Sequence, residues 1–293
     1  MFLVKSSIPK FAVRLYSTTA AATAGAAKEP LVFIEKHLEN GVYNGVSFLK
    51  LNKPAHLNAL TFDMGKDFKD CVDQLAQDKS VKCVILTGAG KAFSAGGDLN
   101  FLMDRTKDSP QNNAVIMEKF YKTYLYIRNI NVPIISAING PAIGAGLCLA
   151  MATDIRLASN KAKMGLTFVS LGISPGMGST HFLPRVVSHQ VATRMLLTGD
   201  VVQGDEAKQL GLVLDVYNQE DLIPQATALA SRIAKQSAIS VQGCLKSIRN
   251  QQNTGLEVSL QREADNQSQC FAHPDIVEGL TAIKESRPPV FKS

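Results

Sequence analysis

The chain has 293 residues, of which 45% are hydrophobic and 19% charged, and its formal net charge is +6. This is the composition of a globular protein, and no apolar run approaches the roughly 20 residues of a membrane helix, so we expect no membrane span. Four basic residues and no acid lie in the first 28 positions, and the rest of the chain then holds 27 basic against 25 acidic residues, a balance that does not indicate nucleic-acid binding.

The chain begins with MFLVKSSIPKFAVRLYSTTAAATAGAAK, which is rich in Ser, Thr and Ala and interleaves apolar residues with cations. This pattern is typical of a mitochondrial transit peptide. The alternative is a basic tail without structure. We therefore expect residues 1–28 to direct the protein to the mitochondrial matrix, and we leave them out of the predicted fold.

The first predicted elements alternate between strand and helix. Residues 42–52 are rich in β-branched and aromatic types and predict a strand that ends in a loop. Thr61 is then placed to cap a helix over Phe62–Gln77, whose apolar residues recur at helical spacing. Residues 81–90 form an apolar strand of the kind buried on both faces, and the following loop leads into a helix at Asp98.

The same alternation continues to the middle of the chain. A second helix is expected before residue 131, Pro133 begins another buried strand, and 155–159 and 162–166 predict short strands. Repeated strand and helix predict an α/β fold.

Beyond about residue 190 the pattern becomes helical, with four amphipathic segments near the end of the chain. We therefore predict a core over 29–190 and a C-terminal helical region over 191–293.

Two segments share one design, an apolar strand followed by a turn of glycine and alanine and then a helix. They read AFSAGGDL and GPAIGAGLCLA. Small residues let a ligand approach the backbone closely, and the first turn of a helix offers N–H groups without acceptors. Two such N–H groups directed at one oxygen atom would stabilise an oxyanion. The alternative is that the small residues only permit tight packing of helix on sheet.

Four motifs in order, KAFSAGGDL, AINGPAIGAGLCLAMATDIRLAS, LGISPGMGSTHFLPR and MLLTGDVVQGDEAKQLGLV, resemble the crotonase (enoyl-CoA hydratase/isomerase) superfamily. The resemblance runs from about residue 32 to the end of the chain. It implies a spiral of ββα units, a homotrimer or hexamer in which 191–293 mediates trimerisation, and an acyl-CoA thioester as substrate. It also implies an oxyanion hole formed by the backbone N–H groups of Gly97 and Ala145. Coenzyme A then arrives with the substrate, and we expect no separate cofactor.

The resemblance further implies two sets of binding residues. The acyl pocket is expected to include Cys148, Phe168, Gly172 and Ser174. The channel for coenzyme A is expected to include Lys53, Ala55, Leu57, Lys91, Phe93, Ser94, Ala95, Gly97, Asp98 and Leu99, although Asp98 is also well placed to cap its helix.

The acids of the family's usual chemistry are missing. The two glutamates of the family's hydratases fall on Cys148 and Phe168, and the aspartate of its hydrolase branch falls on Gly176. Between residues 119 and 199 the only acidic residue is Asp154. The two-carboxylate mechanism is therefore not open to this sequence.

Three side chains are candidates to replace those acids. His181 has a side chain of suitable pKa, but a packing role is the alternative. Cys148 lies near a helix start, which favours a thiolate, whereas its apolar neighbours favour an inert thiol. The Glu118 side chain could swing into the pocket, and the alternative is a carboxylate that stays in solvent on its helix. Ser170 and Ser174 are further possible hydrogen-bond donors.

The five cysteines show no metal-ligand spacing, and we expect no metal site. The sequence thus predicts a mitochondrial acyl-CoA-processing enzyme of the lyase or isomerase class, acting in fatty-acid or branched-chain amino-acid breakdown. The alternatives are an acyl-CoA decarboxylase, a thioester hydrolase, or a protein that binds coenzyme A without catalysis.

Overall fold

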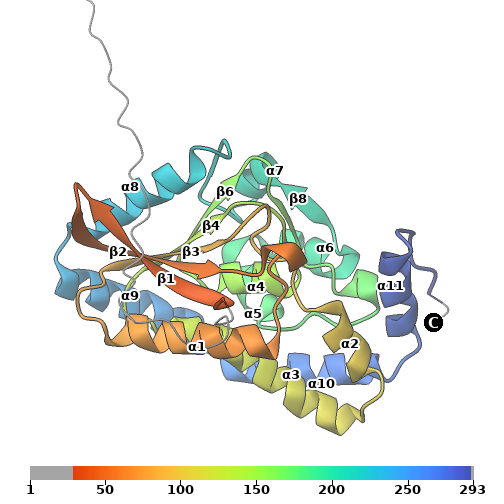
Figure 1. Ribbon diagram of the computed structural model, residues 1–293. Helices are drawn as coiled ribbons and strands as arrows, with labels where there is room; N and C mark the ends of the chain where they lie inside the picture. Colours follow the sequence, from red (N-terminus) through yellow and green to blue (C-terminus); the bar gives the residue numbers. More distant parts are fainter. Residues whose placement is uncertain (1–28, 292–293) are drawn as a thin grey trace, which may run out of the picture.

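The computed structural model describes residues 29–291, so the predicted transit peptide lies outside the described residues. A six-stranded sheet runs through the centre of the molecule (Figure 1). Its strands pair in parallel except for the first two, which form an antiparallel hairpin. In spatial order they are β1 (Val32–Glu39), β2 (Val42–Leu51), β3 (Cys83–Gly88), β4 (Ile134–Ile138), β6 (Ile155–Ser159) and β9 (Asp215–Tyr217).

A second, three-stranded sheet lies at the carboxyl end of β4. It consists of β5 (Ala142–Ile143), β7 (Lys163–Gly165) and β8 (Val201–Gln203), with β7 in the middle. Strand β5 belongs to the second glycine turn, so this small sheet fixes the position of that turn.

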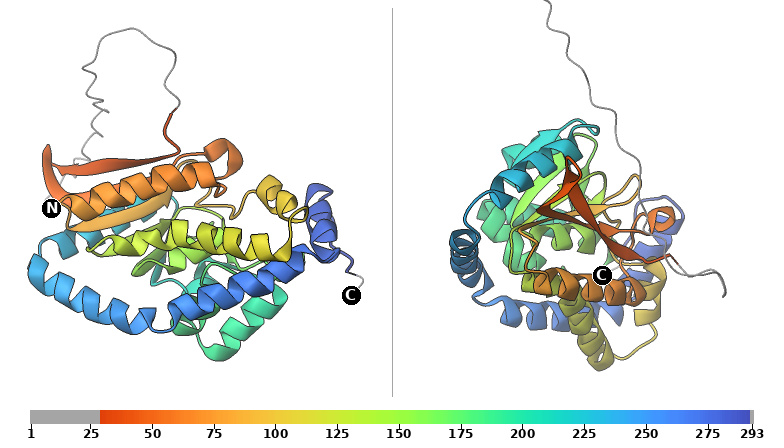
Figure 2. Two further views of the ribbon diagram at one scale, coloured as in Figure 1. Left: turned by 90° about the horizontal axis from the view of Figure 1, so that it is seen from below. Right: turned by 60° about the vertical axis from the view of Figure 1, so that its left-hand side comes forward.

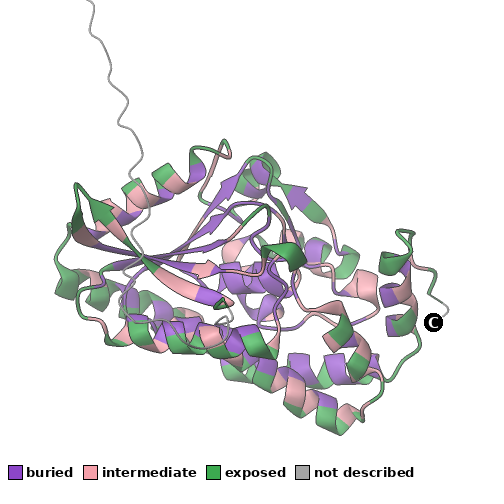
Figure 3. Cartoon of the chain, in the orientation of Figure 1, coloured by how far each residue is buried: buried purple, intermediate pink, exposed green. Residues whose placement is uncertain are grey.

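Both faces of the large sheet are buried, and the reason is visible in the strand sequences. Val46 and Phe48 of β2 contribute to one hydrophobic cluster, whereas Leu49 and Leu51 contribute to the other. Successive side chains of a strand point to opposite faces, so an apolar run supplies both. Figure 3 shows the central strands β3 and β4 buried along their whole length, whereas the tip of the β1–β2 hairpin is exposed.

One face of the sheet is covered by α8 (Leu222–Ala234), and the other by a layer of helices. In that layer α1 (Phe62–Gln77), α3 (Pro110–Leu125) and α10 (Leu256–Phe271) lie side by side (Figure 2). The remaining helices are α2 (Leu99–Arg105), α4 (Ala145–Met151), α5 (Ser179–Val186), α6 (His189–Thr198), α7 (Gly204–Gln209), α9 (Ala238–Asn253) and α11 (Asp275–Lys284), with short 3-10 turns at Pro54–His56, Tyr126–Asn129 and Val169–Leu171.

The α/β prediction is confirmed, and several helix boundaries agree with it. The hydroxyl of Thr61 accepts a hydrogen bond from the Met64 N–H at 3.2 Å, so α1 begins where the sequence predicts. Asp98 caps α2 through the N–H groups of Asn100 and Phe101. The four amphipathic C-terminal segments are α8 to α11.

The predicted division at residue 190 differs from the structure. Strands β8 and β9 lie beyond it and complete the two sheets, and α8 covers one face of the large sheet. Both strands have only three residues, which is too short for a period of two to be read. Strand β1 was also not predicted. Within residues 29–291, no helix combines the length and hydrophobicity of a membrane span, and no three side chains form a metal-binding cluster.

Candidate active site

The two glycine turns are hydrogen-bonded to each other. The N–H groups of Phe93 and Ser94 both donate to the carbonyl of Pro141, at 3.1 and 3.0 Å, and the Ile143 N–H donates to the carbonyl of Ser94 at 3.0 Å. Segments almost 50 positions apart in the chain therefore form one rigid unit at the ends of β3 and β4.

Glycine is required where the two turns touch. A Cβ atom on Gly96 would lie 2.5 Å from the carbonyl oxygen of Ile143 and 3.4 Å from the nitrogen of Ala145. The φ angles of Gly96 and Gly144 are +95° and +51°, values that side chains disfavour. The small residues thus bring the backbone of residues 96–97 against the start of α4.

Both expected oxyanion donors have unused N–H groups. The Leu60 N–H donates to the Gly96 carbonyl at 2.7 Å and the Asp98 N–H donates to the Leu60 carbonyl at 3.2 Å, so the intervening Gly97 N–H is turned away from Leu60. Ala145 is the first residue of α4, where an N–H has no acceptor within the helix. Gly97 and Ala145 line the same pocket.

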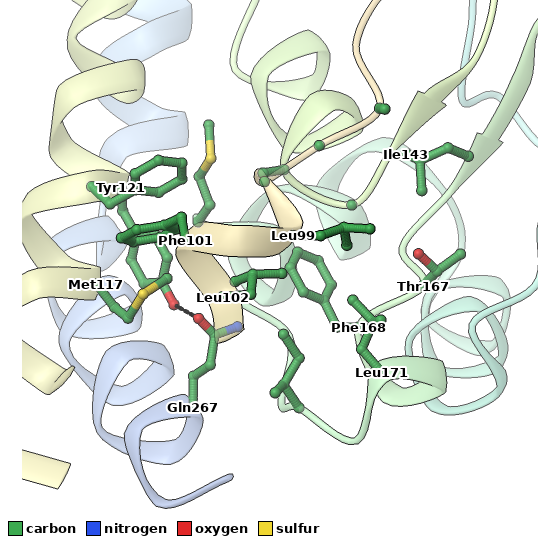
Figure 4. A pocket seen from close by; sticks show the side chains of 18 of the residues that line it. Leu99, Phe101, Leu102, Met117, Tyr121, Ile143, Thr167, Phe168, Leu171 and Gln267 are labelled. Carbon is green, nitrogen blue, oxygen red and sulfur yellow. Dashed lines mark hydrogen bonds between the residues drawn. The ribbon is translucent and has the colours of Figure 1, made fainter. Parts of the chain in front are cut away.

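This central pocket has a volume of about 100 Å³ and is lined mainly by apolar side chains (Figure 4). Of the described residues, none in its wall is an Asp, Glu, His, Lys, Arg or Cys. Besides residues 95–97, 144 and 145 of the glycine turns, the wall is formed by Leu99, Phe101, Leu102, Met117, Phe120, Tyr121, Ile143, Thr167, Phe168, Leu171, Ile173, Met177, Gln267 and Ile283.

Phe168 lies beside the oxyanion turn. Its Cζ atom is 3.9 Å from the position that a Cβ atom on Gly144 would occupy. A benzyl side chain therefore occupies a position where a carboxylate would be able to meet the substrate. It cannot accept or donate a proton, and it removes water from its side of the pocket.

Cys148 is fully buried and lies outside the pocket wall. Its Sγ atom is 3.5 Å from the Gly176 carbonyl oxygen, to which the thiol donates. Burial, with Glu263 nearby, raises the pKa of this thiol well above its usual value. The hypothesis of a Cys148 thiolate nucleophile does not agree with this geometry, because the charged form has neither solvent nor a cation to stabilise it.

His181 is also buried, and it lies on α5 away from the pocket wall. Its Nε2 atom is 2.6 Å from the Gln252 carbonyl oxygen, and its Nδ1 atom is 3.5 Å from the Ser259 hydroxyl. Burial lowers the pKa of the imidazole. The side chain therefore connects α5 to α9 and α10, and the structure gives it no path to a substrate.

Glu118 lies on the solvent side of α3. Its carboxylate forms an ion pair with Lys122 at 2.8 Å, and Lys122 also pairs with Glu257 at 3.1 Å. The hypothesis that Glu118 supplies the missing acid would require it to leave Lys122 and cross its own helix.

The expected coenzyme A residues are brought together, although not all by their side chains. The Ala95 N–H donates to the Leu57 carbonyl at 2.9 Å, so the 53–60 loop lies against the 91–97 loop. Lys91 and Ala55 are exposed and Lys53 is half-buried, whereas the side chains of Phe93 and Ser94 are buried. Phe93 and Ser94 can therefore contact a ligand only through their backbone.

Three of the four expected acyl-pocket residues lie behind the wall. Gly172, with φ of +73°, ends the Val169–Leu171 turn and packs on the backbone of Asp275. Ser174 contributes its carbonyl to Gln267. With Cys148 also behind the wall, only Phe168 of that set faces the pocket.

Sequence reasoning missed the three polar side chains of the wall, which are those of Tyr121, Thr167 and Gln267. The Tyr121 hydroxyl donates to Gln267 Oε1 at 2.7 Å, and Gln267 Nε2 donates to the Ser174 carbonyl at 2.7 Å. A Cβ atom on Gly176 would lie 2.3 Å from the Tyr121 hydroxyl, so this tyrosine fills the space beside Gly176. Only the aromatic pattern of α3 hinted at Tyr121, and a glutamine on an amphipathic helix gives no such signal.

Glu263 of α10 was missed as well. Its carboxylate accepts hydrogen bonds from the Gly178 N–H at 2.6 Å and the Thr180 N–H at 2.8 Å, and from the Thr180 hydroxyl. Burial raises the pKa of this carboxyl. It lies behind the pocket wall and satisfies the first N–H groups of α5.

The chain is similar to known proteins over nearly its whole length. The sequence pattern of the enoyl-CoA hydratase/isomerase family matches residues 41–293. A crotonyl-CoA hydratase of Syntrophomonas wolfei subsp. wolfei is 35% identical, over 85% of this chain and 95% of that protein. A mitochondrial enoyl-CoA hydratase of Pongo abelii is 32% identical, over 92% of this chain and 90% of that protein. The crystal structure of an enoyl-CoA hydratase from Mycobacterium avium subsp. paratuberculosis superposes with a TM-score of 0.76 at 27% identity, covering 90% of this chain and 99% of that one.

Proposed function

The chain belongs to the enoyl-CoA hydratase/isomerase family and is an acyl-CoA-processing enzyme of the lyase or isomerase class, and from this premise we propose how its site works. The thioester oxygen binds to the N–H groups of Gly97 and Ala145, which stabilise the enolate formed during the reaction. No carboxylate of the wall assists. The observation that supports this most is a pocket with two free backbone donors and no acid or base among its described wall residues, apart from the weakly acidic Tyr121.

Addition of water to an enoyl thioester does not suit this wall. That reaction needs one group to activate water and another to handle the proton at the α-carbon, and such groups contribute about 10²–10⁴-fold each. The positions that would supply them hold Cys148 and Phe168, a buried thiol and a hydrocarbon. Burial raises the pKa of Tyr121, so its hydroxyl keeps its proton and is not available as a base.

Decarboxylation of a malonyl-type thioester suits the same wall better. The bond between the α-carbon and the carboxylate breaks, its electron pair forms the enolate, carbon dioxide leaves, and a proton from solvent water is added to the α-carbon. No base is required. Phe168, next to the Gly144 turn, would face the reacting carbon and strip water from the carboxylate that leaves.

The pocket volume limits the acyl group. A volume of about 100 Å³ accommodates several non-hydrogen atoms, and Leu171 and Ile283 are among the apolar side chains that line it. We therefore expect short acyl groups, such as methylmalonyl or ethylmalonyl, to be preferred over long ones.

The experiment that tests the oxyanion assignment is a matched pair of substitutions at Ala145. Ala145→Pro removes the N–H at the first position of a helix, where proline is tolerated, and should lower kcat by about 10²–10³-fold. Ala145→Gly keeps the N–H and should retain activity to within about threefold of the wild type if one backbone donor is what matters. Equal activity of the proline and glycine variants would show that this N–H is not a donor to the substrate.

We also propose that the enzyme acts in the mitochondrial matrix, in fatty-acid or branched-chain amino-acid breakdown. The composition of residues 1–28 supports this location, and a mitochondrial relative is among the similar proteins. A fluorescent reporter carrying residues 1–30 should enter mitochondria. A reporter that stays in the cytosol would contradict the location.

A homotrimer or hexamer is the assembly that the family resemblance implies. The exposed apolar side chains of α9 to α11, such as Ile239, Val258 and Val277, are available for contacts between subunits. Sedimentation equilibrium should give three or six times the mass of one chain, and a monomer at micromolar concentration would contradict this.

A further inference from the structure

Two polar side chains of the central pocket have no part in the chemistry described above. Tyr121 and Gln267 are 2% and 1% exposed, respectively, and lie in a wall that is otherwise almost entirely apolar. Figure 4 shows them joined by a hydrogen bond, near Leu102 and Met117. In an apolar pocket, a small number of well-positioned polar groups determine how a ligand is oriented and which ligand is preferred.

The pair has one donor and one acceptor to spare. The Tyr121 hydroxyl uses its proton on Gln267 Oε1 at 2.7 Å, so its oxygen still has lone pairs to accept with. Gln267 Nε2 uses one proton on the Ser174 carbonyl at 2.7 Å and retains the other. Each of the two atoms already has one partner, and a ligand group that can both donate and accept would add a second hydrogen bond to each.

The Tyr121–Gln267 pair is separated from the Gly97 turn, where the thioester carbonyl would bind, by the side chain of Leu102. Leu102 is within 3.9 Å of the Cβ position of Gly97, and in Figure 4 this leucine stands between the glycine turn and Gln267. A ligand held by its thioester oxygen would therefore meet the pair with the far end of its acyl chain.

We propose that Tyr121 and Gln267 select acyl-CoA thioesters whose acyl chain carries a neutral hydroxyl group at its distal end. The hydroxyl oxygen accepts the free proton of Gln267 Nε2, and the hydroxyl proton is donated to the Tyr121 oxygen. This inference rests on the proposed function, because it assumes that the thioester is bound at Gly97 and Ala145.

A charged distal group does not suit this end of the pocket. Among the described wall residues no Lys, Arg or His is available to pair with an anion. The Glu263 carboxylate lies close enough to contribute to the raised pKa of Tyr121, so an added anion would meet like charge as well as desolvation. The structure therefore favours a hydroxyl group over a carboxylate.

The test measures binding, so that it does not depend on the reaction. Dissociation constants are measured by calorimetry for three pairs of saturated thioesters with equal numbers of non-hydrogen atoms: 4-hydroxybutyryl- and valeryl-CoA, 5-hydroxyvaleryl- and hexanoyl-CoA, and 6-hydroxyhexanoyl- and heptanoyl-CoA. At the length that reaches the pair, the hydroxyl compound should bind more tightly than its alkyl partner. Glutaryl-CoA should bind more weakly than both.

Two variants and a matched control locate the effect. Tyr121→Phe and Gln267→Met should each raise the dissociation constant of the hydroxyl compound about tenfold, which is the effect of losing one hydrogen bond. The dissociation constant of the alkyl partner should change by less than about twofold. Tyr124→Phe is the control, because Tyr124 is an equally buried tyrosine of α3 whose hydroxyl donates to the Thr61 carbonyl outside the pocket. It should change neither constant.

The outcomes separate this inference from the proposed function. The selection of a hydroxyl group would be overturned if the alkyl compound bound more tightly at all three lengths and Tyr121→Phe changed the dissociation constants of the hydroxyl and alkyl compounds equally. That result would not affect the oxyanion assignment. Failure of every thioester to bind would overturn the proposed function itself.

Discussion

At the scale of the residue, the site depends on backbone groups more than on side chains. Gly97 and Ala145 contribute N–H groups whose direction is set by hydrogen bonds of their neighbours, such as those that join Leu60 to Gly96 and Asp98. Such donors are already oriented before the substrate binds, and this is why they stabilise developing charge efficiently.

The thiol and the solvent-exposed acid should be dispensable. Cys148→Ala and Glu118→Gln are both expected to keep kcat within about threefold of the wild type, because neither side chain lines the pocket. Loss of one buried sulfur atom should cost only about 1 kcal/mol of stability. A loss of activity beyond 10²-fold in either variant, with the fold intact by circular dichroism, would restore that residue as a catalytic candidate.

At the scale of the element, helix α5 shows how a distant segment completes the fold around the site. Its first N–H groups are satisfied by Glu263 from α10, a residue 85 positions away from Gly178. Burial raises the pKa of this carboxyl above the ordinary value of 4.5. Protonation is therefore more favourable in the folded chain than in the unfolded one.

This shift predicts a pH dependence of stability. The contribution of Glu263 is full below pH 4.5 and is lost as the pH rises through the raised pKa. Relative to Glu263→Gln, which does not titrate, the free energy of unfolding of the wild type should fall as the pH rises above 4.5. Urea unfolding of both proteins at a series of pH values measures this difference. Parallel profiles would contradict the raised pKa.

The sequence predicted those elements whose signals are local. Thr61 and Asp98 cap their helices as expected, since a cap depends on the next few residues. The two glycine turns that the sequence singles out both line one pocket in the structure. By contrast, Glu263 and Gln267 act through contacts between α10 and segments more than 80 positions earlier, which no local pattern encodes. Of the three-residue strands, β7 was predicted, whereas β8 and β9 were too short to give a readable pattern.

At the scale of the whole molecule, one buried ion pair fastens the C-terminal helices to the sheet. Arg249 of α9 contacts Asp154 at 2.6 Å, and it also donates to the carbonyls of Ile130 and Val132 at the start of β4. The two side chains are 8% and 12% exposed. Removal of one partner would leave an uncompensated buried charge.

We therefore expect Arg249→Leu to lower the free energy of unfolding by about 3–5 kcal/mol. Lys246→Ala is the matched control, because Lys246 is an exposed cation of the same helix, and it should change stability by less than about 0.5 kcal/mol. Denaturant titration gives both values. Similar small effects of the two substitutions would mean that the Arg249 contacts do not hold α9 in place.

The measurement that tests the central claim most directly is mass spectrometry of acyl-CoA thioesters incubated with the protein lacking residues 1–28. The compounds are crotonyl-, 3-enoyl-, methylmalonyl-, ethylmalonyl- and 3-hydroxyisobutyryl-CoA. Enolate stabilisation without a wall carboxylate predicts loss of carbon dioxide from a malonyl-type thioester and no hydration of crotonyl-CoA at an enzymatic rate. Rapid addition of water to crotonyl-CoA would contradict it, because an acid or base would then reach the pocket from outside the described wall.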